Sequence, residues 1–190
     1  MTKKVAIIDI DGCLCEYPNP KFFEFVFEEM GTMFADLGEL KISLGDKYEE
    51  IKTLYRKSGV KRELTLFPGA INGLNRIRSL GYKIYIATSR PNSAVVVRDT
   101  YYWLNSNTVP FDELIFTGDK SIFHFSTIDR EVIVVDDEAR YLLNYLDRSN
   151  VTVFKFACSE DIYLTASNCS NVNGWSELIN IIDSSCRAGA

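Results

Sequence analysis

The sequence predicts an α/β fold in which helices sandwich a parallel sheet. Three observations support this prediction: short apolar runs recur, strand and helix patterns alternate from about residue 66 onward, and the apolar runs end in polar residues. Such alternation is typical of parallel strands that are buried on both faces by crossover helices. A chain of 190 residues suits one domain with a small appendage and can bury roughly 70% of its unfolded surface.

The first strand and a long segment after it open the chain. The apolar run Val5–Ile8 predicts a buried strand, and Pro18–Leu66 separates it from the next repeat. Helical patterns occur at Phe22–Phe27 and Asp46–Lys57. The expected breaks between helices are Gly31, Gly38, Gly45 and Gly59. Because about fifty residues are too many for a simple crossover, we expect a helical insertion over the carboxyl edge of the sheet.

This insertion divides the predicted domain organisation. Residues 18–66 are expected to form a small helical cap. Residues 1–17 and 67–190 are expected to form the core domain.

The next repeats follow in order. Ala70–Leu80 has aliphatic side chains on one stripe and ends at Gly81, which predicts a helix. The strand Lys83–Ala87, the helix Ser93–Leu104 and the strand Glu113–Phe116 come next.

The second half of the chain continues the alternation. Val132–Val135 is nearly continuous and apolar, as a strand covered on both faces should be. A helix is expected at Glu138–Leu146, a fifth strand at Val151–Phe156 and a closing helix at Gly174–Ile182. Asp183–Ala190 is expected to be frayed.

Composition and charge exclude several classes of protein. Lys and Arg number 21 against 26 Asp and Glu, a net charge of −5, and no basic run resembles a nucleic-acid footprint. Nucleic acid is therefore disfavoured as a partner. No stretch approaches the 18 apolar residues that a membrane span needs, and the opening MTKKVAIIDIDG lacks the longer apolar region of a signal peptide. We expect a cytoplasmic protein. No pattern indicates an oligomeric state.

The cysteines do not form a disulfide or zinc pattern. They are Cys13, Cys15, Cys158, Cys169 and Cys186. Their odd count and irregular spacing argue against a disulfide framework. Only one histidine, His124, is present, so a structural zinc site is disfavoured.

Acidic and polar residues follow the predicted strands. The first strand ends in Asp9-Ile10-Asp11-Gly12, the second in Thr88-Ser89-Arg90, and the fourth in Asp136-Asp137. Because the carboxyl ends of parallel strands face one side, these residues are expected to converge on one crevice. Four converging carboxylates repel one another, and Mg²⁺ suits oxygen ligands of this kind.

The chemistry of these residues suits phosphoryl transfer. Asp9 can attack a phosphorus atom, and Asp11 can give a proton to the leaving oxygen and later take one from water. Thr88 and Lys120 can bind the phosphoryl oxygens. Ser89 and Arg90 are candidate substrate-binding residues, although a surface salt bridge is an equal alternative for Arg90.

The motifs resemble those of the haloacid dehalogenase (HAD) superfamily of phosphohydrolases. In order, they are IIDIDGCL, IYIATSR, a lysine assigned to Lys120, and VIVVDDE. The stretch TSRPNSAVVVRDTYYWL and the following FDELIF are similar to deoxyribonucleotidase-type members.

The resemblance implies a Rossmann-like core, Mg²⁺ and an aspartyl-phosphate intermediate. It implies that Asp9 is nucleophile and metal ligand, and that Asp11 is the acid/base and binds metal through its backbone carbonyl. It also implies a ligand in the last motif, which we place at Asp136 first and Asp137 second. The insertion resembles the small helical cap that sets substrate choice in this superfamily.

The sequence therefore favours a Mg²⁺-dependent phosphomonoesterase that acts on a small phosphorylated metabolite, most simply a nucleotide. Within the same superfamily, a polynucleotide-end phosphatase and a phosphomutase remain as alternatives, and a dehalogenase is less favoured. A signalling receiver module uses a similar residue set, but its acidic pair precedes the phosphorylated Asp. No G-x-G-x-x-G follows the first strand, so dinucleotide binding is weakly supported.

Overall fold

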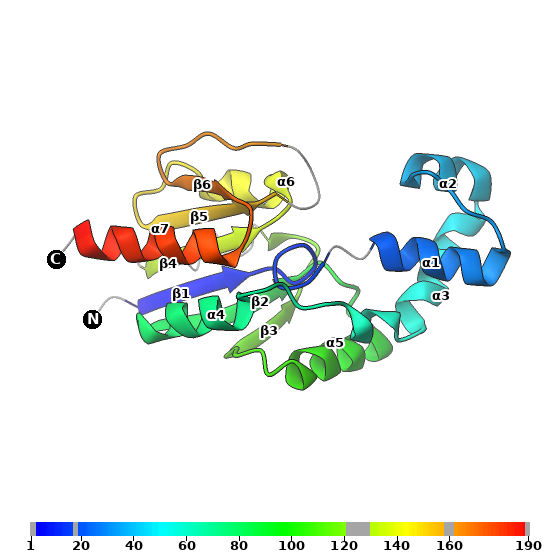
Figure 1. Ribbon diagram of the computed structural model, residues 1–190, viewed down its shortest axis with the longest axis horizontal. Helices are drawn as coiled ribbons and strands as arrows, with labels where there is room; N and C mark the ends of the chain where they lie inside the picture. Colours follow the sequence, from blue (N-terminus) through cyan, green and yellow to red (C-terminus); the bar gives the residue numbers. More distant parts are fainter. Residues whose placement is uncertain (1–2, 17–18, 121–129, 158–161, 189–190) are drawn as a thin grey trace. The chain divides into compact units, whose positions relative to one another are not determined.

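A six-stranded parallel sheet forms the centre of the computed structural model, which describes residues 3–16, 19–120, 130–157 and 162–188 (Figure 1). The strands are β1 (Lys3–Ile8), β2 (Tyr82–Thr88), β3 (Glu113–Phe116), β4 (Arg130–Asp136), β5 (Val151–Phe156) and β6 (Cys169–Val172). Helices pack on this sheet, so the predicted α/β, Rossmann-like fold is confirmed.

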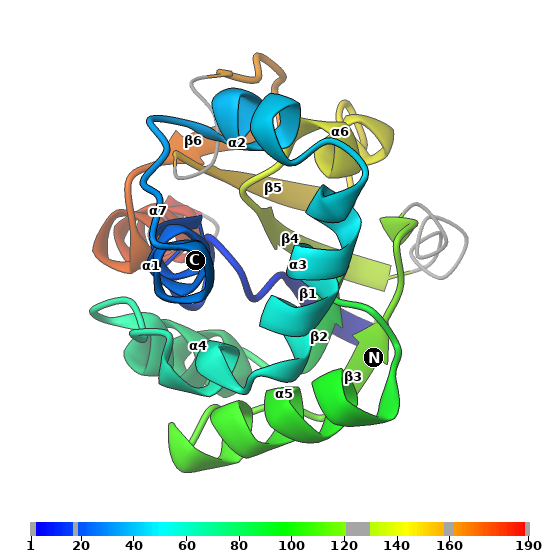
Figure 2. The ribbon, with the colours of Figure 1, turned by 90° about the vertical axis from the view of Figure 1, so that its right-hand side faces the viewer.

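The strand order reverses between β1 and β4. The order is β3-β2-β1-β4-β5-β6, and Figure 2 shows it from the ends of the strands. The chain builds outward from β1 in one direction and from β4 in the other, so these two neighbours form the point where the order reverses. Ligands of open α/β sheets bind beyond the carboxyl ends of the strands at such a point. Asp9 directly follows β1, and Asp136 ends β4.

The chain divides into two compact units. The larger comprises Met1–Tyr17, Thr65–Pro91 and Asn107–Ala190, and the second comprises Pro18–Leu64 and Asn92–Ser106. The second unit thus includes a helix from beyond the predicted insertion. The role of the insertion as a cap stays a prediction.

In the larger unit, helices cover both faces of the sheet. Helices α4 (Ala70–Ser79) and α7 (Trp175–Ala188) pack together on one face (Figure 1). A Cβ atom on Gly73 would lie 2.1 Å from the Trp175 ring, so glycine is required for this close approach. The short α6 (Ala139–Leu142) and the 3₁₀ turn Leu143–Tyr145 pack on the face that carries Val5, Val132 and Val153.

Helices form the second unit. They are α1 (Asn19–Met30), α2 (Leu37–Leu44), α3 (Lys47–Lys57), the 3₁₀ turn Val60–Glu63 and α5 (Ala94–Ser106). Their core is aromatic and aliphatic, with Phe22, Phe25, Leu40 and Tyr55 among its buried members. Two contacts explain why α5 belongs here: Trp103 Nε1 donates a hydrogen bond to the Leu64 carbonyl at 2.8 Å, and Arg62 binds Asp99.

Two local expectations were wrong, and one strand was not anticipated. Gly38 does not break a helix but lies in the first turn of α2, because the Asp36 carboxylate caps that helix and accepts the Gly38 N–H at 2.7 Å. The C-terminal residues continue α7 to Ala188, where Arg76 binds Asp183 at 2.7 Å. The short, polar β6 was not anticipated at all.

Among the described residues, no helix combines the length and the apolar character that crossing a membrane requires.

Candidate active site

A tight turn after β1 sets the positions of the first two aspartates. The Ile10 carbonyl accepts hydrogen bonds from the N–H groups of Leu14 at 2.9 Å and Cys15 at 3.1 Å. The Asp9 N–H donates to the Val135 carbonyl of β4 at 3.0 Å, which extends the sheet by one residue. The side chain of Asp9 is therefore held between the ends of β1 and β4 and is buried.

Glycine is required at position 12 of this turn. Gly12 has φ of +87°, which favours glycine over residues with a Cβ atom. A Cβ there would also lie 2.3 Å from Asp137 Oδ2. The turn and the acidic end of β4 thus approach each other in direct contact.

Lys120 connects the ends of β1 and β4. Its Nζ lies 2.5 Å from Asp9 Oδ1 and 2.6 Å from Asp136 Oδ2, and all three side chains are buried. Burial opposes the charged ammonium, but the two carboxylates outweigh it and raise the pKa of Lys120 above its ordinary value. Burial also raises the pKa of Asp9 and Asp136, and Lys120 opposes that rise.

Two tyrosines hold Lys120 in place. Tyr145 donates its hydroxyl to the Lys120 carbonyl at 2.7 Å, and burial raises the pKa of that phenol to about 12. The Lys120 Nζ also lies 4.5 Å from the centre of the Tyr141 ring, within the range of a cation–π contact. Both tyrosines come from the segment that follows β4.

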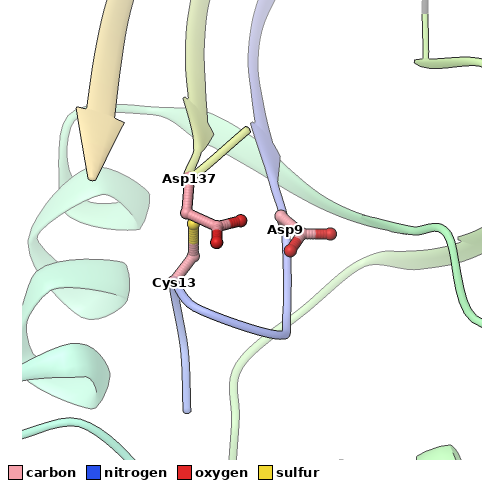
Figure 3. Close-up of side chains that lie close together, drawn as sticks. All are labelled: Asp9, Cys13 and Asp137. Carbon is pink, nitrogen blue, oxygen red and sulfur yellow. The ribbon is translucent and has the colours of Figure 1, made fainter. Parts of the chain in front are cut away.

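Asp9, Cys13 and Asp137 form a second group of buried side chains. Figure 3 shows their side chains pointing toward one another, and one potential ligand atom from each lies within 4.8 Å of the others. All three residues are buried. Burial and the neighbouring Asp137 and Asp9 carboxylates raise the pKa of the Cys13 thiol, which keeps it protonated.

Asp11 points to a different partner. Arg90 binds it with two nitrogens, with Nε 3.0 Å from Oδ2 and Nη2 2.5 Å from Oδ1. Arg90 is buried, and although burial disfavours its charge, the Asp11 carboxylate raises its pKa. The Cys15 thiol lies 3.8 Å from Asp11 Oδ1. The salt bridge foreseen for Arg90 is therefore present, but it is inside the site and not on the surface.

The two residues before Arg90 differ in exposure. Thr88 is buried at the end of β2, and its hydroxyl oxygen accepts the Arg90 N–H at 3.2 Å. The Thr88 carbonyl accepts the Thr117 N–H at 2.9 Å, which joins the ends of β2 and β3. Ser89 is exposed.

The charges of the site suit a divalent cation. Four carboxylates, those of Asp9, Asp11, Asp136 and Asp137, face two cations, Lys120 and Arg90, so the six side chains carry −2 when all are ionised. Carboxylate oxygens are the ligands that Mg²⁺ prefers. The residues present therefore fit the expected metal, with the Asp9 and Asp137 carboxylates and the Cys13 thiol within 4.8 Å of one another.

The structure brings most of the sequence-derived candidates to one edge of the sheet. Residues from four strand ends contribute, because β1, β2, β3 and β4 are adjacent in the sheet. The sequence assigned Asp136 before Asp137 as a metal ligand, whereas Asp136 binds Lys120 and Asp137 lies beside Asp9.

Three supporting residues were not singled out by the sequence patterns: Tyr141, Tyr145 and Trp175. Trp175 Nε1 donates to the Cys13 carbonyl at 2.8 Å and so ties α7 to the turn after β1. The polar atom of a buried tyrosine or tryptophan usually makes a hydrogen bond. This general rule is the signal that could have identified Tyr145 and Trp175 as supporting residues.

The four described cysteines, Cys13, Cys15, Cys169 and Cys186, are free thiols. Cys158 and His124 lie outside the described residues.

Sequence comparison shows which family this chain belongs to. The profile of the family described as "5' nucleotidase, deoxy (Pyrimidine), cytosolic type C protein" matches residues 3–188. The chain belongs to this family. It is a phosphatase of the HAD superfamily, as the sequence motifs predicted. Among curated proteins, no sequence matches this member of the nucleotidase family.

Solved structures share the fold of this nucleotidase-family chain. A predicted phosphatase from Clostridium acetobutylicum has a TM-score of 0.67 and 17% identity, over 97% of this chain and 99% of that chain. A HAD hydrolase, family IA, variant 3 from Entamoeba histolytica has a TM-score of 0.59 and 19% identity, over 95% and 99%. A HAD-superfamily hydrolase from Ehrlichia chaffeensis has a TM-score of 0.56 and 17% identity, over 96% and 97%.

Proposed function

We propose that this phosphatase hydrolyses the phosphomonoester of a small metabolite, a nucleoside 5'-monophosphate above all, with Mg²⁺ and through a phosphoryl group carried on Asp9. One observation carries the proposal: Asp9 lies at the reversal point of the sheet, bound to Lys120 and adjacent to Asp137. The description of the matched family favours a nucleotide as the substrate.

Asp9 acts as the nucleophile in this proposal. A carboxylate oxygen of Asp9 forms a bond to phosphorus while the bond from phosphorus to the ester oxygen breaks. Lys120, already 2.5 Å from Asp9, offers a positive charge to the phosphoryl oxygens and fixes the carboxylate in place. Thr88, buried at the end of β2, is proposed to bind a phosphoryl oxygen through its hydroxyl.

Asp11 acts as the acid and base. In its protonated form Asp11 gives a proton to the departing ester oxygen. The resulting carboxylate then takes a proton from the water that attacks the phosphorus atom, which returns Asp9 as a free carboxylate. The products are the alcohol and inorganic phosphate. Because Arg90 binds Asp11 through two nitrogens, it orients the Asp11 carboxylate between these steps. A direct contact of Arg90 or Ser89 with the substrate stays a prediction.

Asp9 and Asp137 are the residues that would hold Mg²⁺, with the Asp11 carbonyl expected from the family resemblance as a further ligand. When bound, the cation offsets the repulsion between the carboxylates and the substrate phosphate. Lys120 holds Asp136 in an ion pair, so Asp136 serves to position Lys120.

The direct test is hydrolysis of an aryl phosphate with Mg²⁺ by the parent and by Asp9→Asn. An amide is a far weaker nucleophile than a carboxylate, so we expect the variant to lose a factor of at least about 10³ in kcat. Asp147→Asn is the matched control, because Asp147 is exposed and its φ of +58° is one that asparagine tolerates. Parent-like turnover by Asp9→Asn, with an unchanged melting temperature, would refute the assignment of the nucleophile.

Substrate class needs a separate comparison. A nucleoside 5'-monophosphate, a sugar phosphate and a 5'-phosphorylated oligonucleotide are offered at equal concentration with Mg²⁺. The proposal expects the highest kcat/KM for the mononucleotide. Preference for the oligonucleotide would replace it with a polynucleotide-end phosphatase.

A further inference from the structure

A cavity lies at the opposite edge of the sheet from the candidate active site. Its volume is about 570 Å³, and it is lined by residues at the amino ends of β1, β2 and β4. Lys3 begins β1 and Asp9 follows its last residue, so the two ends are separated by roughly 20 Å at the rise of a strand. The cavity is therefore a place distinct from the active site.

Three cations converge on this cavity from three neighbouring strands. In the β1–β4 register Lys3 is opposite Arg130, and in the β1–β2 register Val5 is opposite Lys83. Because side chains alternate along a strand, Lys3, Val5, Lys83 and Arg130 all lie on the same face of the sheet. The cations thus surround Val5 at adjacent positions.

No described carboxylate neutralises these three charges. Lys3, Lys83 and Arg130 form no ion pair with any described residue. The carboxylates around the edge are engaged elsewhere: Glu131 binds Lys4 at 2.9 Å, and Asp112 binds Arg78.

Glu113 is the carboxylate at this edge on the neighbouring strand β3. It is opposite Tyr85 in the β2–β3 register, and it does not line the cavity. The cavity therefore carries an excess of positive charge in a protein whose net charge is −5. A local field of this kind attracts anions.

Lys4 and Glu131, which bind each other, also line the cavity together with Gly81, and part of its wall is apolar. Leu80, Val5 and the half-buried Tyr85 line it beside the cations. Its volume is in the range of pockets that bind small molecules. Three adjacent cations with a partly apolar wall match a small ligand that carries several phosphoryl groups.

We propose that this amino-edge cavity is a binding site for an oligophosphate-bearing small molecule, with Lys3, Lys83 and Arg130 as the phosphate ligands. The site is independent of the catalytic reaction, so it stands whether or not the proposed substrate is correct.

The test is binding of inorganic tripolyphosphate by calorimetry, with the full chain freed of divalent cations on a chelating resin. Under these conditions the carboxylates of the active site repel the anion, so binding there is suppressed. We compare the parent with Lys3→Gln/Lys83→Gln, and with Lys47→Gln/Lys57→Gln as control. All four lysines are exposed, and both variants lose the same charge.

We expect one tripolyphosphate per chain, weakened at least about tenfold by Lys3→Gln/Lys83→Gln and less than about twofold by the control. The amide resonances of Val5 and Tyr85 should shift on titration. Absence of binding to the parent would overturn the proposal. Equal weakening by both variants would also overturn it, because that result indicates general charge attraction.

Discussion

Two clusters, each built of buried aspartates and the basic side chains that bind them, differ in their ratio of negative to positive charges. The strand-end cluster is Asp9, Asp136 and Lys120, in the larger unit. The helix cluster is Asp99, Arg62 and Arg98, in the second unit, where Arg62 and Arg98 lie 2.5 and 3.2 Å from the same Asp99 oxygen.

The balance is opposite in the two clusters. Two carboxylates share one buried cation at the strand ends, whereas two partly exposed cations share one buried carboxylate among the helices. A buried excess of negative charge is costly, and it is tolerated where a cation or a reaction uses it. The excess positive charge of the helix cluster is on partly exposed side chains that water can solvate, and the cluster ties α5 to the turn Val60–Glu63.

The largest effect is expected from Lys120→Met, which breaks the strand-end cluster. Methionine leaves Asp9 and Asp136 buried without the ammonium, so the free energy of unfolding should fall by about 3–5 kcal/mol in the absence of metal. Loss of the charge on the phosphoryl group should also lower kcat by a factor of about 10² or more. Urea unfolding and aryl phosphate hydrolysis measure the two effects.

Lys57→Met is the control for this variant, because Lys57 is exposed in the last turn of α3. It should change stability by less than about 0.5 kcal/mol. Mg²⁺ should raise the melting temperature of Lys120→Met more than that of the parent, since a cation then replaces the missing charge. An unchanged stability and rate in Lys120→Met would show that the strand-end cluster is not held by this residue.

A smaller effect is expected from Asp99→Ala in the helix cluster. The substitution removes a buried acceptor that binds Arg62, so the free energy of unfolding should fall by about 2 kcal/mol. Arg62 is about one-third exposed and can turn to water, which limits the loss. Hydrolysis of an aryl phosphate by the folded variant should stay within about twofold of the parent. A loss of turnover as large as that of Lys120→Met would abolish the distinction between the clusters.

The difference between the clusters also explains what the sequence could predict. Asp9, Lys120 and Asp136 follow apolar strands, and a parallel sheet brings such positions to one edge whatever the details of packing. Asp99 lies within the helix predicted at Ser93–Leu104, and Arg62 lies beyond the end of the helix predicted at Asp46–Lys57. Neither position indicates a partner 37 residues away. Their pairing depends on how α5 packs against the turn Val60–Glu63, which local periodicity does not encode.

The same limit applies inside the active site. The ion pair between Asp11 and Arg90 depends on the direction of the Asp11 side chain at a turn. Side-chain direction also decides that Asp136 binds Lys120 while Asp137 lies beside Asp9. A one-residue difference reverses the direction of a side chain at a strand end. The strand β6 was missed for another reason: Cys-Ser-Asn-Val has one strongly apolar residue and no alternation to detect.

The smallest effect is expected from Arg98→Ala, which removes the outer cation of the helix cluster. The Arg98 side chain is 66% exposed, and its Nε lies 3.2 Å from Asp99. Because water solvates the exposed Arg98 guanidinium and Arg62 still binds Asp99, the free energy of unfolding should change by less than about 0.5 kcal/mol, measured by urea unfolding. The double variant Arg98→Ala/Asp99→Ala should then be no less stable than Asp99→Ala alone. A loss near that of Asp99→Ala would mean that Arg98, and not the better-buried Arg62, balances the carboxylate, and the two clusters would then differ less than their geometry indicates.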